Sequence, residues 1–156
     1  MTRTEMIAKL RTQLCDVQSV GFPSDDELLA YLDRGTIYYS EQMIAAKDPS
    51  MLKKMPVVGC ADLPDDFVAL AGQFPVQITG RHMDYYGDVP FQIIYFANLP
   101  LPSGFAADAE VKHPFGSDVI ILDLARAFAL NRNEYDITQD LKLVEIWQTA
   151  AKEARA

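Results

Sequence analysis

The residues best suited to chemistry lie near the middle of the chain, where His82, Asp84 and Asp88 offer one imidazole and two carboxylates. Side chains of these types bind divalent metals, and such a trio would suit a small metal-dependent hydrolase. The other histidine, His113, is distant in sequence, so no second histidine stands at a ligand spacing. The polar rim of a hairpin accounts for the same residues, and we therefore predict neither a metal nor another cofactor.

Other candidate catalytic residues are better explained by local structure. Asp65 and Asp66 could act as a general acid and base, but they follow Leu63-Pro64, and Pro and Asp in this order are typical of a β-turn. The sequence contains no GxSxG nucleophile motif and no GxxxxGK[ST] or GxGxxG phosphate loop. We therefore expect the protein not to be an enzyme.

The composition argues against nucleic acids and membranes as direct ligands. The chain has 14 Lys and Arg against 22 Asp and Glu, a formal net charge of −8, which disfavours binding to phosphates. Aromatic residues between positions 85 and 96 could stack on bases, but such platforms need a basic groove, so core packing explains them better. We find no apolar segment typical of a signal peptide or of a bilayer-spanning helix.

The spacing of apolar residues predicts a bundle of about four helices, at residues 4–17, 24–47, 117–130 and 136–154. The third helix is apolar almost all round, so other elements of the fold or a partner chain must cover it. Gly35 lies in the apolar stripe of the second helix. Either a closely approaching helix or a tolerated glycine accounts for it.

A small antiparallel β insertion is expected between the helix pairs, at about residues 56–97. Residues 74–86 and 88–97 are predicted to form its hairpin, because a Tyr-Gly-Asp turn separates two strand patterns. A proline-rich loop at residues 98–116 then leads back to the helices. The chain 1–156 is thus predicted to be one mainly α-helical domain with an inserted hairpin or small sheet.

The last predicted strand is apolar on both faces, which requires cover on both sides. Together, this strand and the almost wholly apolar helix present more apolar surface than one small layer can cover. Contacts between subunits are therefore expected. The predicted subunit-interface residues are Phe91, Ile93, Tyr95 and Phe96.

The order of these features resembles the head-to-tail adaptor (connector) proteins of tailed bacteriophages. The resemblance rests on an early helix with an acidic start, PSDDELLAYLDRGTIYYSEQM, and on a β region with LPDDFVAL followed by FQIIYFANLPLP. It rests also on the closing stretch ILDLARAFALNRNEYDITQDLKLVEIWQTAAKEAR. Together these stretches cover most of the chain.

The resemblance implies a structural virion protein of the neck, present in the host cytoplasm during assembly. Such proteins form a ring with further copies of themselves, usually a dodecamer. The ring binds the portal protein, receives the next neck or tail protein and lets packaged DNA pass without specific binding. In such relatives the C-terminal segment grips the portal. Here that segment supplies Trp147, Lys152 and Arg155 as predicted portal contacts.

Two further readings of the sequence stay open beside the metal-dependent hydrolase. One is another neck or tail-completion protein, such as a stopper. The other is an interaction module that binds a protein helix in a groove lined by Tyr31, Tyr38 and Tyr39.

Overall fold

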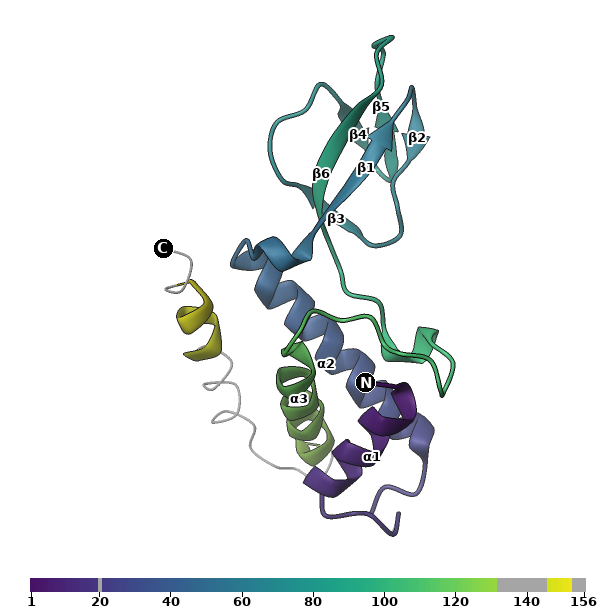
Figure 1. Ribbon diagram of the computed structural model, residues 1–156, viewed down its shortest axis with the longest axis vertical. Helices are drawn as coiled ribbons and strands as arrows, with labels where there is room; N and C mark the ends of the chain where they lie inside the picture. Colours follow the sequence, from purple (N-terminus) through teal and green to yellow (C-terminus); the bar gives the residue numbers. More distant parts are fainter. Residues whose placement is uncertain (20, 132–145, 153–156) are drawn as a thin grey trace.

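The computed structural model describes residues 1–19, 21–131 and 146–152. The molecule is elongated, with a helical body at one end and a β module, residues 52–97, at the other (Figure 1). The helical body contains α1 (Arg3–Gln13), α2 (Asp25–Ala45) and α3 (Ser117–Asn131). A 3-10 turn, η1 (Pro49–Met51), leads from α2 into the β module.

The first helix begins with a capping box and ends earlier than predicted. The Thr2 hydroxyl accepts a hydrogen bond from the Glu5 amide at 3.2 Å, and the Glu5 carboxylate accepts one from the Thr2 amide at 2.8 Å. The helix ends at Gln13, and Cys15 adopts a left-handed φ of 54°. The predicted extension over residues 4–17 is therefore wrong, and Val17 is 71% exposed.

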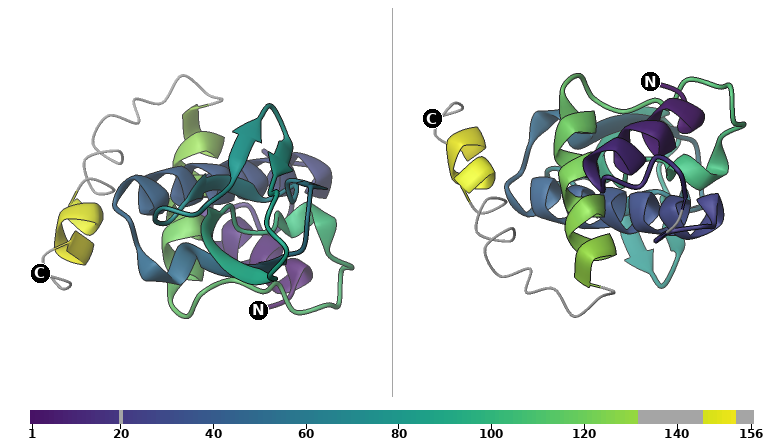
Figure 2. Two further views of the ribbon diagram at one scale, coloured as in Figure 1. Left: turned by 90° about the horizontal axis from the view of Figure 1, so that it is seen from above. Right: turned by 90° about the horizontal axis from the view of Figure 1, so that it is seen from below.

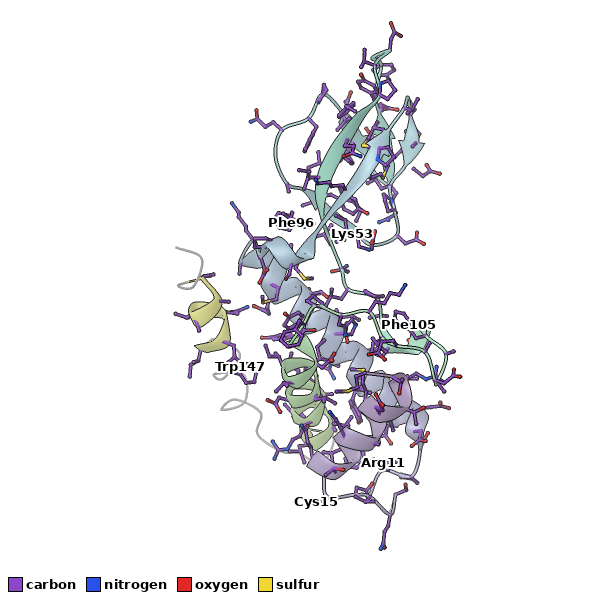
Figure 3. The ribbon with its side chains drawn as sticks, viewed as in Figure 1. Arg11, Cys15, Lys53, Phe96, Phe105 and Trp147 are labelled. Atoms are coloured by element: carbon purple, nitrogen blue, oxygen red, sulfur yellow. The ribbon has the colours of Figure 1, made fainter. Side chains whose placement is uncertain are left out.

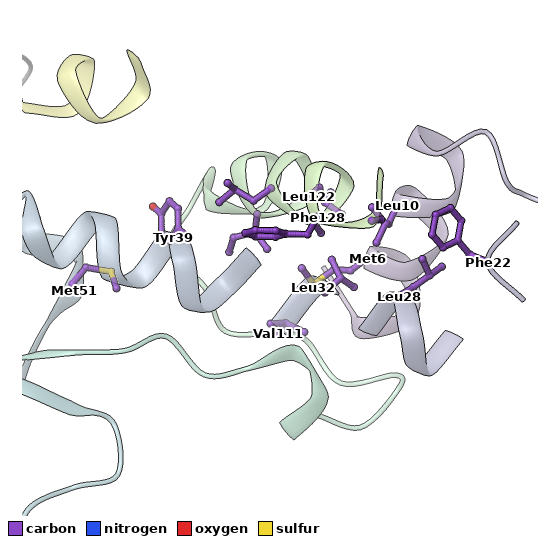
Figure 4. Packing of buried hydrophobic residues seen from close by; sticks show 14 residues of the cluster. Met6, Leu10, Phe22, Leu28, Leu32, Tyr39, Met51, Val111, Leu122 and Phe128 are labelled. Carbon is purple, nitrogen blue, oxygen red and sulfur yellow. The ribbon is translucent and has the colours of Figure 1, made fainter. Parts of the chain in front are cut away.

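The second and third helices form the centre of the helical body, and α1 packs against both (Figure 2). A Cβ atom on Gly35 would lie 3.0 Å from the Ile121 carbonyl oxygen and 3.2 Å from the Ala125 amide nitrogen. Of the two explanations that the sequence left open for Gly35, the structure supports the closely approaching helix. Figure 4 shows the core that results, which the following buried residues dominate: Met6, Leu10, Phe22, Leu28, Leu32, Tyr39, Met51, Val111, Leu122 and Phe128.

The chain itself covers most of the apolar surface of α3. Ile121 and Ala125 are fully buried against the other helices, whereas Val119, near the start of the helix, remains 62% exposed. Most of the apolar surface of α3 is thus covered by other elements of the same chain.

The β module contains more sheet than predicted. It consists of two three-stranded antiparallel sheets, with strand orders β1-β6-β3 and β2-β5-β4. The description of a mainly α-helical bundle carrying one hairpin is therefore wrong, and the chain combines a helical body with a two-sheet module. The strands are β1 (Leu52–Val57), β2 (Ala61–Asp62), β3 (Phe67–Leu70), β4 (Gln77–Thr79), β5 (His82–Asp84) and β6 (Phe91–Ala97).

The predicted hairpin of residues 74–86 with 88–97 does not form. Strand β5 pairs with β2 and β4, whereas β6 pairs with β1 and β3, so the segment between β5 and β6 connects the two sheets. The tight turn lies instead between β4 and β5, where Gly80 has a φ of 60°. Both sheets contribute to a second core, which consists of Val57, Leu63, Met83, Ile93, Tyr95 and Ala97.

The connecting loop, residues 98–116, is held against the helical body. It contains one 3-10 turn, η2 (Pro102–Gly104). Backbone hydrogen bonds join the Thr4 amide to the Ala107 carbonyl at 3.2 Å and the Val111 amide to the Met1 carbonyl at 3.0 Å. The loop is therefore an ordered part of the fold, although its sequence has no regular pattern.

Residues 146–152 are helical, in agreement with the end of the fourth predicted helix. The remainder of that prediction, at residues 136–145 and 153–154, lies outside the described residues. Among the described helices, none is both long enough and apolar enough to cross a bilayer.

Candidate functional site

Strand pairing places His82, on the central strand of the second sheet, between two carboxylates. Asp62 on β2 pairs with His82 on β5, and His82 and Asp84 alternate onto the same face of their strand. The ring Nδ1 lies 3.2 Å from Asp62 Oδ1, and Nε2 lies 3.0 Å from Asp84 Oδ1. The hydrogen bond to Asp62 raises the pKa of His82 above its ordinary value, and the charge of Asp84 acts in the same direction.

A cysteine completes this group. Cys60 Sγ, a nitrogen of His82 and a carboxylate oxygen of Asp84 all lie within 4.8 Å of one another. We call Cys60, Asp62, His82 and Asp84 the His82 cluster. All except Asp84 are exposed, so the cluster is open to solvent.

The sequence-based trio was only partly right, because Asp88 lies outside this group of ligand atoms. Cys60 and Asp62 were missed because they are distant in sequence from His82, with Cys60 just before β2 and Asp62 on it. The pairs Cys60-x-Asp62 and His82-x-Asp84 share the spacing of residues on one strand face, but only the pairing of β2 with β5 brings the pairs together.

Asp65 and Asp66 do not form an acid–base pair, and the turn interpretation holds. The Phe67 amide donates to the Pro64 carbonyl at 3.1 Å, which closes the turn. Asp66 is engaged by Lys53 Nζ at 2.5 Å and by the Tyr95 hydroxyl at 3.4 Å. Burial raises the pKa of Tyr95, and the charge of Asp66 adds to this effect.

These residues border a hollow between the β module and the helical body. The hollow has a volume of about 500 Å³ and is lined by Ile37, Ser40, Lys53, Asp66 and Leu99 among others. Figure 3 shows Lys53 and Phe96 at this junction. The ion pair between Lys53 and Asp66 neutralises both charges, and Asp65 is the other carboxylate in the lining.

The four residues predicted to contact a neighbouring subunit are covered within their own chain. Ile93 and Tyr95 are 0% and 5% exposed, because they face the core between the two sheets. Phe91 packs edge-on against Tyr85 at a centroid distance of 4.6 Å, and Phe96 packs on the core of the helical body. One face of this strand is buried within the molecule, but the predicted burial of the other face is only partial, because Gln92 is exposed and Phe96 is half-buried.

Two of the three predicted portal contacts lie in the described helix of residues 146–152. Trp147 is half-buried and packs on α2 and α3, beside Tyr39 and Leu124. Gln148 donates a hydrogen bond to Gln42 on α2, which fixes the same segment. Lys152 is exposed, and Arg155 lies outside the described residues. Trp147 thus anchors the segment to its own chain, and Lys152 is available to a partner.

The tyrosines proposed to line a helix-binding groove are engaged in the helical body. Tyr39 is 7% exposed. Tyr31 packs edge-on against Phe22, and Tyr38 packs edge-on against Phe128. These contacts argue against a groove at this place.

Exposed apolar side chains gather at two places that the sequence did not indicate. Val58, Tyr86 and Val89 are 73%, 81% and 72% exposed at the far end of the β module, and we call them the tip patch. Val58 and Val89 are brought near each other because Val57 pairs with Phe91. Phe115 and Val119 are exposed at the start of α3, and we call them the helix-start patch. Both patches involve turn residues, which carry no periodic signal.

Comparison with known proteins leaves the chain without an assigned family. Neither a protein-family model nor a curated protein matches it. The function is therefore argued below from the chain itself.

Proposed function

We propose that the protein is a structural component of the neck of a tailed bacteriophage, an adaptor that forms a ring of identical copies on the portal. The ring would receive the next neck or tail protein and continue the channel for DNA. The proposal is supported by the order of sequence features that resembles such adaptors and by the distribution of exposed apolar surface.

The observation that carries the proposal is the pair of separate apolar patches. The tip patch belongs to the β module, whereas the helix-start patch lies at the start of α3 in the helical body. A closed ring of identical subunits needs two different surfaces on each copy, because its contacts run head to tail. A tip patch that seats on the helix-start patch of the next copy would satisfy this requirement.

The charge of the chain suits a channel protein. With 22 acidic against 14 basic residues, the surface repels the phosphates of DNA. A ring lined by such subunits would let DNA pass without holding it, as the proposed function requires.

Mixed variants of the two patches test the proposal. Tyr86→Ser with Val89→Ser removes most of the tip patch, and Phe115→Ser removes most of the helix-start patch. Each variant alone should fail to form rings on the portal protein in electron micrographs. A mixture of the two should form dimers and stop there, because one intact interface remains between unlike copies.

Val68→Ser is the matched control, since Val68 is an exposed apolar residue of β3 outside both patches. Rings should form with this control as with the unchanged chain. Rings that persist in either patch variant would exclude the proposed interface, and failure of the unchanged chain to bind portal protein would contradict the adaptor role.

A stopper-type neck protein is the second candidate, and the two sheets of the β module favour it more than a purely helical chain would. Such a protein would join the neck only after another component has bound the portal. Direct binding of the purified chain to portal protein alone therefore favours the adaptor, and binding that needs a further neck protein favours the stopper.

A further inference from the structure

We propose that the His82 cluster binds one divalent transition-metal ion of the zinc class. The ligands are the Cys60 thiolate, His82 Nε2 and an Asp84 carboxylate oxygen, and Asp62 orients the imidazole. This proposal does not depend on the role in a phage neck, because it rests on the geometry of the β module alone.

The distances between the donor atoms suit a small tetrahedral ion. Zinc binds sulfur at about 2.3 Å and nitrogen or oxygen at about 2.0–2.2 Å, so two ligands of one ion lie roughly 3.4–3.8 Å apart. The three donor atoms are within 4.8 Å of one another, and His82 Nε2 is 3.0 Å from Asp84 Oδ1. Small side-chain rotations are sufficient to bring all three to one ion.

Asp62 lies where a carboxylate that hydrogen-bonds to a metal-binding histidine would lie. Asp62 Oδ1 lies 3.2 Å from His82 Nδ1 and accepts a hydrogen bond from that ring nitrogen. This bond leaves the lone pair of Nε2, which lies 3.0 Å from Asp84 Oδ1, free for an ion. A carboxylate that fixes the ring in this way is a common feature of histidine–metal sites, and it raises the basicity of the ligand nitrogen.

The donor set selects the class of ion. One thiolate, one imidazole and one carboxylate favour zinc or cobalt, whereas magnesium and calcium prefer oxygen ligands alone. Three protein ligands at a site open to solvent leave a fourth position for water. The ion would stabilise the module by joining the segment before β2 to β5, because β2 and β5 are otherwise held together by a ladder of only two residue pairs.

The ion would also fix the segment that carries the tip patch. Cys60 Sγ lies 4.0 Å from the Tyr85 carbonyl oxygen, and the Tyr85 hydroxyl donates to the Val89 carbonyl at 2.6 Å. A metal bound at Cys60 and Asp84 would therefore restrict two segments. One is the connection before β2, which carries Val58, and the other is the connection after β5, which carries Tyr86 and Val89.

Metal titration of the full chain tests the site. Protein that has been reduced and freed of metal is titrated with Zn²⁺ by calorimetry and with Co²⁺ by absorption spectroscopy. We expect one ion per chain and a thiolate-to-cobalt charge-transfer band. Cys60→Ser should abolish that band, His82→Gln and Asp84→Asn should each weaken Zn²⁺ binding at least tenfold, and Asp62→Asn should weaken it about 10–100-fold.

Two matched controls keep the test specific. Cys15→Ser removes the other free cysteine, which is also exposed, and Asp88→Asn removes a carboxylate of the same module outside the cluster. Both should keep the band and the affinity of the unchanged chain, and circular dichroism without metal should be the same for all variants. Absence of stoichiometric binding, or loss of the band in Cys15→Ser with retention in Cys60→Ser, would overturn the proposal.

Discussion

Strand geometry places two carboxylates beside His82, and their effect on the pKa of His82 should be measurable in the metal-free protein in solution. The hydrogen bond from the ring to Asp62 raises the pKa of His82, and the charge of Asp84 adds to the effect. A raised pKa in the folded state means that the protonated ring stabilises the fold at low pH. That contribution is lost as the pH rises through the folded-state pKa.

NMR titration of His82 in the presence of a chelator should give a midpoint above the ordinary histidine value of about 6.5. The Asp62→Asn variant should lower the midpoint, because it removes the largest cause of the shift. Asp88→Asn serves as the control and should leave the midpoint nearly unchanged. A midpoint at or below the ordinary value would show that the two carboxylates do not hold the ring.

Arg11 is the buried charge that holds the chain after α1. Its guanidinium contacts Asp16 Oδ2 at 3.3 Å, and both side chains are about one tenth exposed. It also donates to the Phe22 carbonyl at 2.7 Å and contacts Asp25, which is mostly exposed. The contacts to Asp16 and Phe22 should therefore contribute more to stability than the contact to Asp25.

Arg11→Ala should destabilise the protein by about 3 kcal/mol, since it leaves the Asp16 carboxylate buried without its cation. Urea denaturation followed by circular dichroism measures this difference. Lys9→Ala is the control on the same helix, because Lys9 is exposed, and it should change stability by less than about 0.5 kcal/mol. A comparable loss in both variants would show that the buried pair contributes no more to stability than an exposed residue of the same helix.

At the scale of elements, the contact between α2 and α3 depends on the missing side chain at Gly35. The nearest atoms to a Cβ at this position belong to the backbone of α3 at Ile121 and Ala125, which cannot rotate away. The helices must therefore separate to accept any larger residue.

Gly35→Leu should lower the free energy of unfolding by about 3 kcal/mol, because overpacking forces the two backbones apart. Gly104→Leu is the matched control, since a Cβ there meets nothing within 4 Å. Chemical denaturation of both variants decides the question. An equal effect at the two sites would indicate that α2 and α3 do not approach closely in solution.

The helices were predictable from the sequence where the signal is local. Apolar spacing gives α2 and α3 nearly to their ends, and a glycine within a stripe correctly indicates the close crossing. Strand pairing was not predictable in this way. The partners of β6 precede it in the chain, with β4 and β5 of the other sheet between β3 and β6, so no local turn identifies them.

The same limit explains what was missed in the candidate site. His82 and Asp84 are two residues apart and stand out in the sequence, whereas Cys60 and Asp62 join them only through the pairing of β2 with β5. The apolar alternation of β6 was read correctly, but the sequence could not show that the second sheet and the helical body already cover Ile93 and Phe96.

At the scale of the whole molecule, the proposed function rests on exposed apolar surface and not on a catalytic site. The described chain buries the segments that first suggested subunit contacts and exposes apolar side chains at two other places. Which surfaces remain exposed depends on the packing of the complete fold. The class of protein therefore stays a proposal based on a resemblance, and the sequence could not locate the exposed apolar patches.

The bonds between α1 and the connecting loop have a consequence for synthesis of the protein. Arg3 donates to the carbonyl of Phe105, a residue 102 positions further along the chain. Ribosomes add roughly 5–20 residues per second, so α1 emerges several seconds before the loop that it binds. During that interval α1 can pack on α2 but not on α3 or the loop, so its final position is fixed only after the rest of the helical body has been made.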